Sequence, residues 1–161
     1  HEIRPAPHAS LSQEQERSLR QLDSFDAPYL EEKLLKENVF QSREQYQEAF
    51  TEFKKFVALG NLKKDTRLGM TSKTVDAVWH QFILFTPQYH EFCDDFVGEY
   101  LHHVPKTSFT PAVRQDRMNF IDAYRETFGE IPEIWNTGYS SQSAATCTNG
   151  GPDDCVSCCR S

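Results

Sequence analysis

Apolar side chains recur at intervals of three and four residues from Leu11 to about Phe128, and this spacing constrains the fold more than any other feature. One face of an α-helix repeats with this period, whereas a half-buried β-strand alternates every second residue. No segment of useful length shows the bounded alternation that predicts strands. We therefore expect an all-α fold, a small bundle of about four to five helices.

Two helices can be placed directly from this pattern. One predicted helix carries a stripe of apolar residues and ends near Gly60, a typical helix stop; the stripe is Tyr46, Phe50, Phe53 and Val57. A later helix should follow Thr110-Pro111, because Thr caps helices and Pro suits the first helical position. Its apolar members are Val113, Met118, Ile121, Tyr124 and Phe128.

The 161 residues are enough for one domain with a core. We expect residues 1–10 to be a loose lead-in, residues 11–136 to form the helical domain, and residues 137–161 to be an irregular tail. Four of the five cysteines lie in this tail, among Ser, Thr, Gly and Asn.

Charge and hydropathy exclude some partners. The net charge of −7, without a basic stripe, argues against a nucleic-acid partner, which requires clustered Lys and Arg. No apolar run approaches the ~20 residues of a membrane helix, and the N-terminus has no signal-peptide core. We expect no membrane partner and a cytoplasmic location, although secretion after removal of a signal peptide would leave no trace. A peptide or protein partner remains compatible, and the oligomeric state is not set.

The segment from Thr74 to Pro105 concentrates four of the six histidines and the remaining cysteine, Cys93. Its first half predicts a helix from Ser72 to Phe85. Thr86-Pro87 then repeats the cap-and-proline signal and predicts the start of a second helix. The expected inward residues are Val75, Val78, Trp79 and Phe82 in the first helix, and Tyr89, Phe92, Cys93, Phe96 and Tyr100 in the second.

His80 and Cys93 lie six and seven residues from Thr86, so an antiparallel pair of helices would bring both to one gap. A corner is the alternative, because the junction is tight. Asp76 precedes His80 by four residues and predicts either a ligand or an acceptor for the imidazole N–H. His90 shares the face of Cys93 and is a candidate for the same roles.

His102 and His103 can join these residues only if Gly98 permits a bend. His80, Cys93 and one of the two later histidines would then form a three-ligand set with an open position, as in catalytic zinc sites. We expect a transition-metal ion, with zinc preferred and copper or iron as alternatives. The competing interpretation makes these residues hydrogen-bonded packing residues.

A longer motif runs through the same segment, and it resembles that of the glycine-rich domain-containing protein-like family, whose bacterial members are largely uncharacterised. The resemblance implies a site at His80, Cys93 and either His102 or His103, with His90 outside the motif. It implies no reaction, because the family supplies none. The residues that carry it are Val75-Asp76, Trp79-His80, Phe82 to Thr86, Tyr89, Phe92-Cys93, Gly98, Leu101-His102-His103 and Pro105.

The tail thiols allow three interpretations: a zinc site, two disulfides, or a reactive or modifiable peptide. The residues are Cys147, Cys155, Cys158 and Cys159. Because five is an odd number, we expect these four to act together and Cys93 to act separately.

Taken together, these patterns predict a metal-binding helical protein with His and Cys ligands and a thiol-rich tail. Whether it is an enzyme stays open, since neither H-E-x-x-H nor a recognisable nucleophile pattern is present. The alternative is a helical carrier, leader or interaction domain that displays a modifiable or disulfide-bonded tail, with the central His and Cys structural only.

Overall fold

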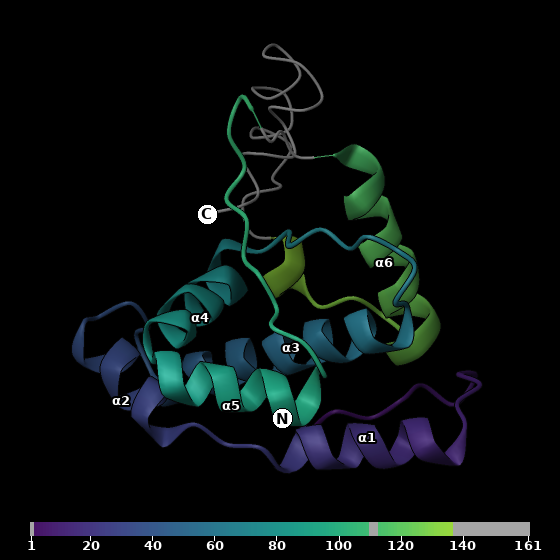
Figure 1. The fold of residues 1–161 in the computed structure, drawn as a ribbon, viewed down its shortest axis with the longest axis horizontal. Helices are drawn as coiled ribbons and strands as arrows, with labels where there is room; N and C mark the ends of the chain where they lie inside the picture. Colours follow the sequence, from purple (N-terminus) through teal and green to yellow (C-terminus); the bar gives the residue numbers. More distant parts are fainter. Residues whose placement is uncertain (1, 110–112, 137–161) are drawn as a thin grey trace.

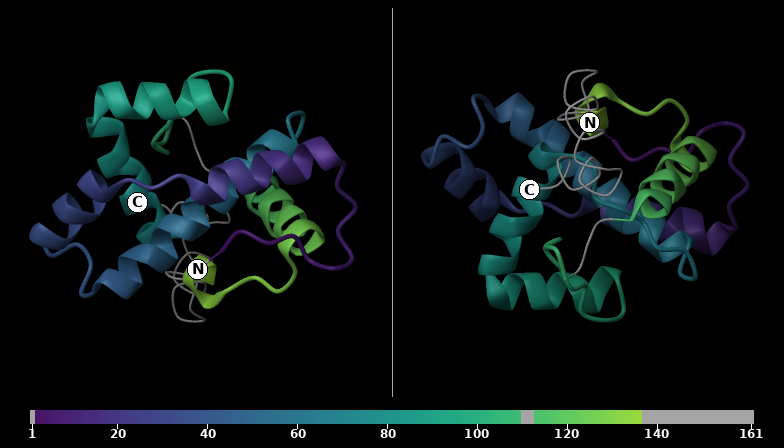
Figure 2. Two further views of the ribbon diagram at one scale, coloured as in Figure 1. Left: turned by 90° about the horizontal axis from the view of Figure 1, so that it is seen from below. Right: turned by 90° about the horizontal axis from the view of Figure 1, so that it is seen from above.

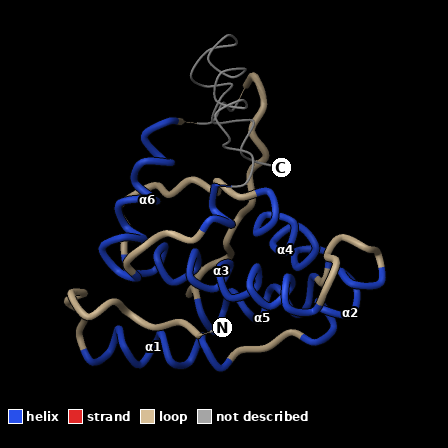
Figure 3. Tube along the Cα trace, turned by 180° about the vertical axis from the view of Figure 1, so that it is seen from behind, coloured by secondary structure: helices blue, strands red, loops and turns tan. Residues whose placement is uncertain are grey.

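The computed structural model describes residues 2–109 and 113–136, and within these ranges all regular structure is helical (Figures 1 and 3). The prediction of an all-α bundle is therefore confirmed, with more helices than the four to five expected. The elements are α1 (Gln13–Ser24), α2 (Pro28–Lys36), α3 (Arg43–Leu62), α4 (Lys73–Leu84), α5 (Thr86–Phe96), α6 (Arg114–Phe128) and the short 3₁₀-helix η1 (Glu133–Asn136).

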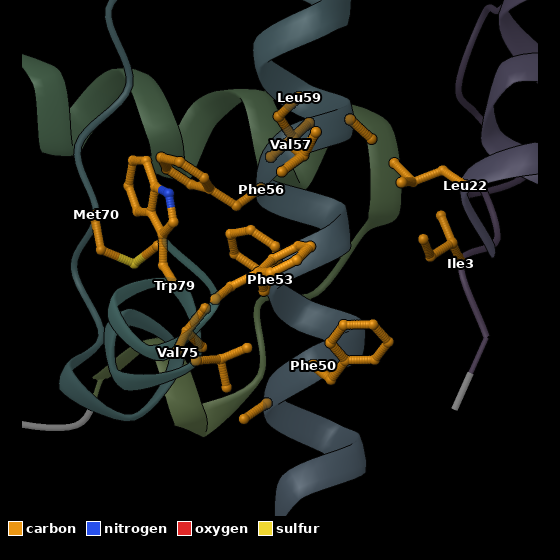
Figure 4. Packing of buried hydrophobic residues seen from close by; sticks show 14 of the residues in the cluster. Ile3, Leu22, Phe50, Phe53, Phe56, Val57, Leu59, Met70, Val75 and Trp79 are labelled. Atoms are coloured by element: carbon orange, nitrogen blue, oxygen red, sulfur yellow. The ribbon is translucent and has the colours of Figure 1, made fainter. Parts of the chain in front are cut away.

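Helix α3 is the centre of the bundle and contacts α1, α2, α4 and α6. Its start is fixed by Ser42, whose hydroxyl accepts a hydrogen bond from the Gln45 backbone N–H at 3.1 Å. The predicted stripe Tyr46, Phe50, Phe53 and Val57 is buried, but α3 continues past Gly60 to Leu62. Figure 4 shows Met70, Val75 and Trp79 on one side of α3, with Ile3 and Leu22 on the other.

Helix α6 packs on α3 through a buried carboxylate. Glu52 of α3 accepts hydrogen bonds from the Tyr124 hydroxyl at 2.6 Å and the Trp135 indole N–H at 2.7 Å. Lys55 completes the network, 3.0 Å from the second Glu52 oxygen. The predicted members Val113 and Met118 are instead 40% exposed, because the inner face of α6 carries Phe120, Ala123 and Tyr124. Thr110-Pro111 lies outside the described residues.

Helices α4 and α5 meet at a corner (Figure 2). Phe85 ends α4 and also caps α5, so one residue joins the two helices. The predicted start at Thr86-Pro87 is confirmed. A single junction residue cannot fold α5 back along α4, and the antiparallel arrangement that would bring His80 and Cys93 to one height is wrong.

The chain turns back after α5 at Gly98, which has φ of +91°, a value that favours glycine. Residues 99–109, the return segment, contain no helix or strand and lead toward the N-terminal end of α6 (Figure 1). This segment brings His103 to α4.

The N-terminal residues, expected to be a loose lead-in, lie against the bundle in the structure. Ile3 is buried, and its backbone N–H donates to Asp23 at 3.0 Å. The Ala6 N–H donates to the Thr127 carbonyl at 2.8 Å, so this segment connects α1 with α6. No helix among the described residues is both long enough and apolar enough to cross a membrane.

Candidate metal centre

The centre of the candidate site is Asp76, which is fully buried in the first turn of α4. Ser72 caps this helix, because its hydroxyl accepts from the Val75 N–H at 3.1 Å. The partial positive charge of a helix N-terminus favours an anion at this position. The position of Asp76 in the first turn of α4 therefore already favours a buried carboxylate, independently of the histidines.

His80 lies one helical turn after Asp76, so the two side chains share a face of α4. The Nε2 atom of His80 lies 3.4 Å from Oδ2 of Asp76, and the His80 side chain is 43% exposed. This contact is the one that the four-residue spacing predicts. Because His80 is partly exposed, solvent reaches the site on the side of this histidine.

His103 reaches the same carboxylate from the return segment. Its Nε2 atom lies 2.7 Å from Oδ1 of Asp76, and its side chain is only 6% exposed. The His103 ring packs edge-on against Trp79, with centroids 4.5 Å apart, and against His80, with centroids 4.2 Å apart. Both histidines therefore present Nε2 to one buried carboxylate.

Asp76, His80 and His103 form a group that could hold a metal ion, since one ligand atom from each lies within 4.8 Å of the others. Oδ2 of Asp76 is buried and has no hydrogen-bond partner. A buried charged oxygen without a hydrogen bond is unfavourable and calls for a compensating charge.

The other predicted ligands lie outside this group. The Cys93 side chain is buried, and its Sγ accepts from the Leu101 N–H at 3.5 Å. His90 pairs with Asp94 on the exposed face of α5, at 3.3 Å. His102 packs against Tyr100, with ring centroids 4.8 Å apart. The return segment thus brings His103, rather than His102, to the carboxylate.

A set of buried polar contacts beside the site was not predicted. The Trp79 indole N–H donates to the Tyr89 hydroxyl at 2.9 Å, and that hydroxyl donates to the Leu101 carbonyl. Burial raises the pKa of Tyr89, so the hydroxyl keeps its proton at ordinary pH. The signal in the sequence is the four-residue spacing of Tyr89 and Cys93, which puts both on one face of α5.

A cavity of about 540 Å³ lies next to the site but does not open onto its candidate ligands. Trp79, Leu101 and His102 belong to its lining, together with residues of α3, whereas Asp76, His80 and His103 do not. Trp79 lines the cavity, and its ring also packs against His103, with centroids 4.5 Å apart. The exposed side of His80 is therefore the open face of the metal-ligand group.

Comparison with known protein families matches residues 14–128 to one family, UCP032817-like, which covers most of the chain. The chain belongs to the UCP032817-like family. The matched region runs from α1 to α6 and includes all three members of the metal-ligand group. Neither the curated proteins nor the solved structures include a significant match.

Membership of the UCP032817-like family corrects the resemblance drawn from the central motif. That motif suggested a glycine-rich domain-containing family, and the assignment is wrong because the match over residues 14–128 is to a different, uncharacterised family. About thirty residues around a Trp-His pair were too short a basis for the assignment. The tail cysteines Cys147, Cys155, Cys158 and Cys159 lie outside both the family match and the described residues.

Proposed function

We propose that this chain binds a divalent transition-metal ion through Asp76, His80 and His103. The observation that carries the proposal is the buried Oδ2 atom of Asp76, which has no hydrogen-bond partner and faces a histidine nitrogen. A cation among the three side chains gives this oxygen the partner that it lacks. The ligand atoms are already close, so binding requires small shifts rather than refolding.

Electrostatics favour a cation here over an uncharged ligand. Removing a carboxylate from water is costly unless it is paired, and a divalent ion is a stronger partner than a neutral imidazole. The Trp79 ring against His103 makes one wall of the site apolar, which strengthens charge interactions inside it. Nε2 of each histidine must be unprotonated to bind the ion, so the affinity should fall at low pH.

Two histidines and one carboxylate favour zinc, with iron as the main competitor. Zinc sites with three protein ligands keep a fourth position for water, and His₂-carboxylate sets occur among them. The same set with several open positions is typical of non-haem Fe(II). Copper also accepts imidazole ligands, and the absence of a thiolate from the group makes it the weaker candidate.

The exposed side of His80 would give solvent access to an ion held by the three side chains. A metal ion there could lower the pKa of bound water or polarise a carbonyl. The proposal therefore covers metal binding and leaves a reaction open. A peptide or another small molecule could reach the ion from this side.

The experiment is elemental analysis of protein purified without a histidine tag, followed by titration of the metal-free protein with Zn²⁺, Fe²⁺ and Cu²⁺ against a competing chelator. The tail cysteines are blocked by alkylation under native conditions so that they do not contribute. The proposal predicts one tightly bound ion per chain, zinc in the elemental analysis, and tighter binding of Zn²⁺ than of Fe²⁺; Cu²⁺ binds N/O sites more tightly than Zn²⁺ as a rule, so its affinity does not identify the native metal. Absence of binding for every ion would leave Asp76 and His103 as a hydrogen-bonded structural pair.

A further inference from the structure

Both backbone polar groups of Leu101 are held by side chains of α5. The Leu101 carbonyl accepts from the Tyr89 hydroxyl, and the Leu101 N–H donates to Cys93 Sγ at 3.5 Å. Tyr89 and Cys93 are buried to 0% and 1% exposure. We call this set of contacts the Leu101 clamp. It fixes an otherwise irregular segment two residues before His103.

The donor directions in the Leu101 clamp are set by chemistry. An indole N–H only donates, so the Tyr89 oxygen must accept from Trp79 Nε1, 2.9 Å away. The Tyr89 proton is then free to point at the Leu101 carbonyl. Because burial raises the pKa of Tyr89, this donor persists over the ordinary pH range.

Trp79 links the Leu101 clamp to the metal-ligand group. Its indole nitrogen binds Tyr89, while its ring packs on His103 with centroids 4.5 Å apart. It also lies on α4, between Asp76 and His80 in sequence. One side chain thus contacts both the clamp and the histidine that the return segment delivers.

We propose that Tyr89 is a positioning residue for the metal site, which acts through Trp79 and the Leu101 carbonyl to hold His103 beside Asp76. This inference rests on the proposed function and assigns roles to two motif residues, Tyr89 and Trp79, that do not touch the ion. Cys93 takes a secondary part, since its sulfur is a weak acceptor. The return segment has no helix or strand that could keep His103 in place, so its position depends on side-chain contacts such as those of the Leu101 clamp.

The test compares Tyr89→Phe with the matched control Tyr100→Phe, because Tyr100 is 40% exposed whereas Tyr89 is buried. Zinc affinity is measured by chelator competition well below the melting temperature. Loss of a partner that orients a ligand typically lowers affinity by about 10–100-fold. We expect a loss in this range for Tyr89→Phe and less than about a twofold change for Tyr100→Phe.

A second readout needs no metal. In the metal-free protein, nitrogen-15 spectra of His103 report its hydrogen bond to Asp76, and we expect Tyr89→Phe to shift the His103 signals while those of His90 stay unchanged. If the wild-type protein binds none of Zn²⁺, Fe²⁺ and Cu²⁺, the proposed function fails, and this spectrum alone decides whether Tyr89 holds His103 beside Asp76. If wild type binds zinc and Tyr89→Phe binds it equally well, the positioning role is refuted.

A second variant keeps the test decisive if Tyr89→Phe does not fold. Trp79→Phe removes the indole N–H that donates to Tyr89 and keeps an aromatic ring beside His103, and we expect a loss of zinc affinity of about a few-fold, with a corresponding shift of the His103 signals. Unchanged affinity and unchanged His103 signals in this variant would overturn the inference.

Discussion

Nε2 of His103 lies 2.7 Å from Oδ1 of Asp76, although 27 residues separate them in the chain. The pair joins the first turn of α4 to the return segment after α5. Neither element alone makes a site. The exposed His80, one turn along α4, completes the group and leaves one face open to solvent.

The ligand assignment predicts an uneven result from single substitutions. Asp76→Asn, His80→Ala and His103→Ala should each lower zinc affinity by more than about 100-fold, since each removes a direct ligand rather than a supporting group. His90→Ala and His102→Ala should change it by less than about twofold. Isothermal titration of the metal-free variants measures these affinities. Full binding by His103→Ala, or loss of binding by His102→Ala, would contradict the assignment.

Replacing Gly98 and Gly60 by alanine should have opposite effects on the stability of the protein. Gly98→Ala should destabilise the protein by about 1–2 kcal/mol, because its φ of +91° is unfavourable for a residue with a Cβ. It should also weaken zinc binding, since the return segment begins there. Gly60→Ala is the control: this glycine lies inside α3 with open space around it. Alanine there should stabilise the helix by up to about 1 kcal/mol.

Urea unfolding monitored by circular dichroism measures both glycine effects. Equal stability changes of the same sign at the two positions would show that the bend at Gly98 is not required. A stable Gly98→Ala variant with wild-type zinc affinity would separate the bend from the site.

Buried tyrosines predict a loss of stability at high pH. Burial is the largest cause that raises the pKa values of Tyr46, Tyr89 and Tyr124, and Glu52 raises that of Tyr124 further. Above pH of about 10, unfolded tyrosines lose their protons while folded ones keep them, so the unfolded state gains stability. The stabilising contribution is complete below that pH and decreases as pH rises.

Chemical denaturation at pH 8 to 11 tests this sign, and Tyr124→Phe is the matched variant. It should lower stability at neutral pH by about 1.5–3 kcal/mol, since it removes a hydrogen bond to the Glu52 carboxylate. It should also make the alkaline decline shallower. A decline equally steep in this variant would show that Tyr124 does not contribute to it.

Cys93 should be protected from thiol reagents in the native protein. Its side chain is 1% exposed and lies at the Leu101 backbone. We expect alkylation of Cys93 only after unfolding, and no disulfide between Cys93 and Cys147, Cys155, Cys158 or Cys159. Peptide mass mapping before and after denaturant addition measures both. Rapid native labelling of Cys93, or such a disulfide, would refute the prediction.

Local signals in the sequence predicted much of this arrangement. The Thr86-Pro87 start of α5 follows from its cap-and-proline pattern, and the Asp76–His80 contact follows from helical spacing. The bend at Gly98 follows from the conformational freedom of glycine. Each of these depends on interactions within a few residues.

Contacts between residues far apart in the chain could not be predicted from such local signals. The position of Cys93 depends on the angle between α4 and α5, and the single residue Phe85 makes a corner where the spacing also allowed a hairpin. The choice between His102 and His103 depends on how the irregular return segment is held at Leu101. No periodic pattern encodes that contact, because side chains from α5 determine it.

The most direct measurement is an anomalous-scattering map from crystals of the full chain grown with one equivalent of Zn²⁺, recorded on both sides of the zinc absorption edge. We predict a zinc peak about 2.0–2.2 Å from Oδ2 of Asp76 and from Nε2 of His80 and His103. A map with no peak among these three side chains, in crystals that contain zinc elsewhere in the chain, would contradict the proposed site.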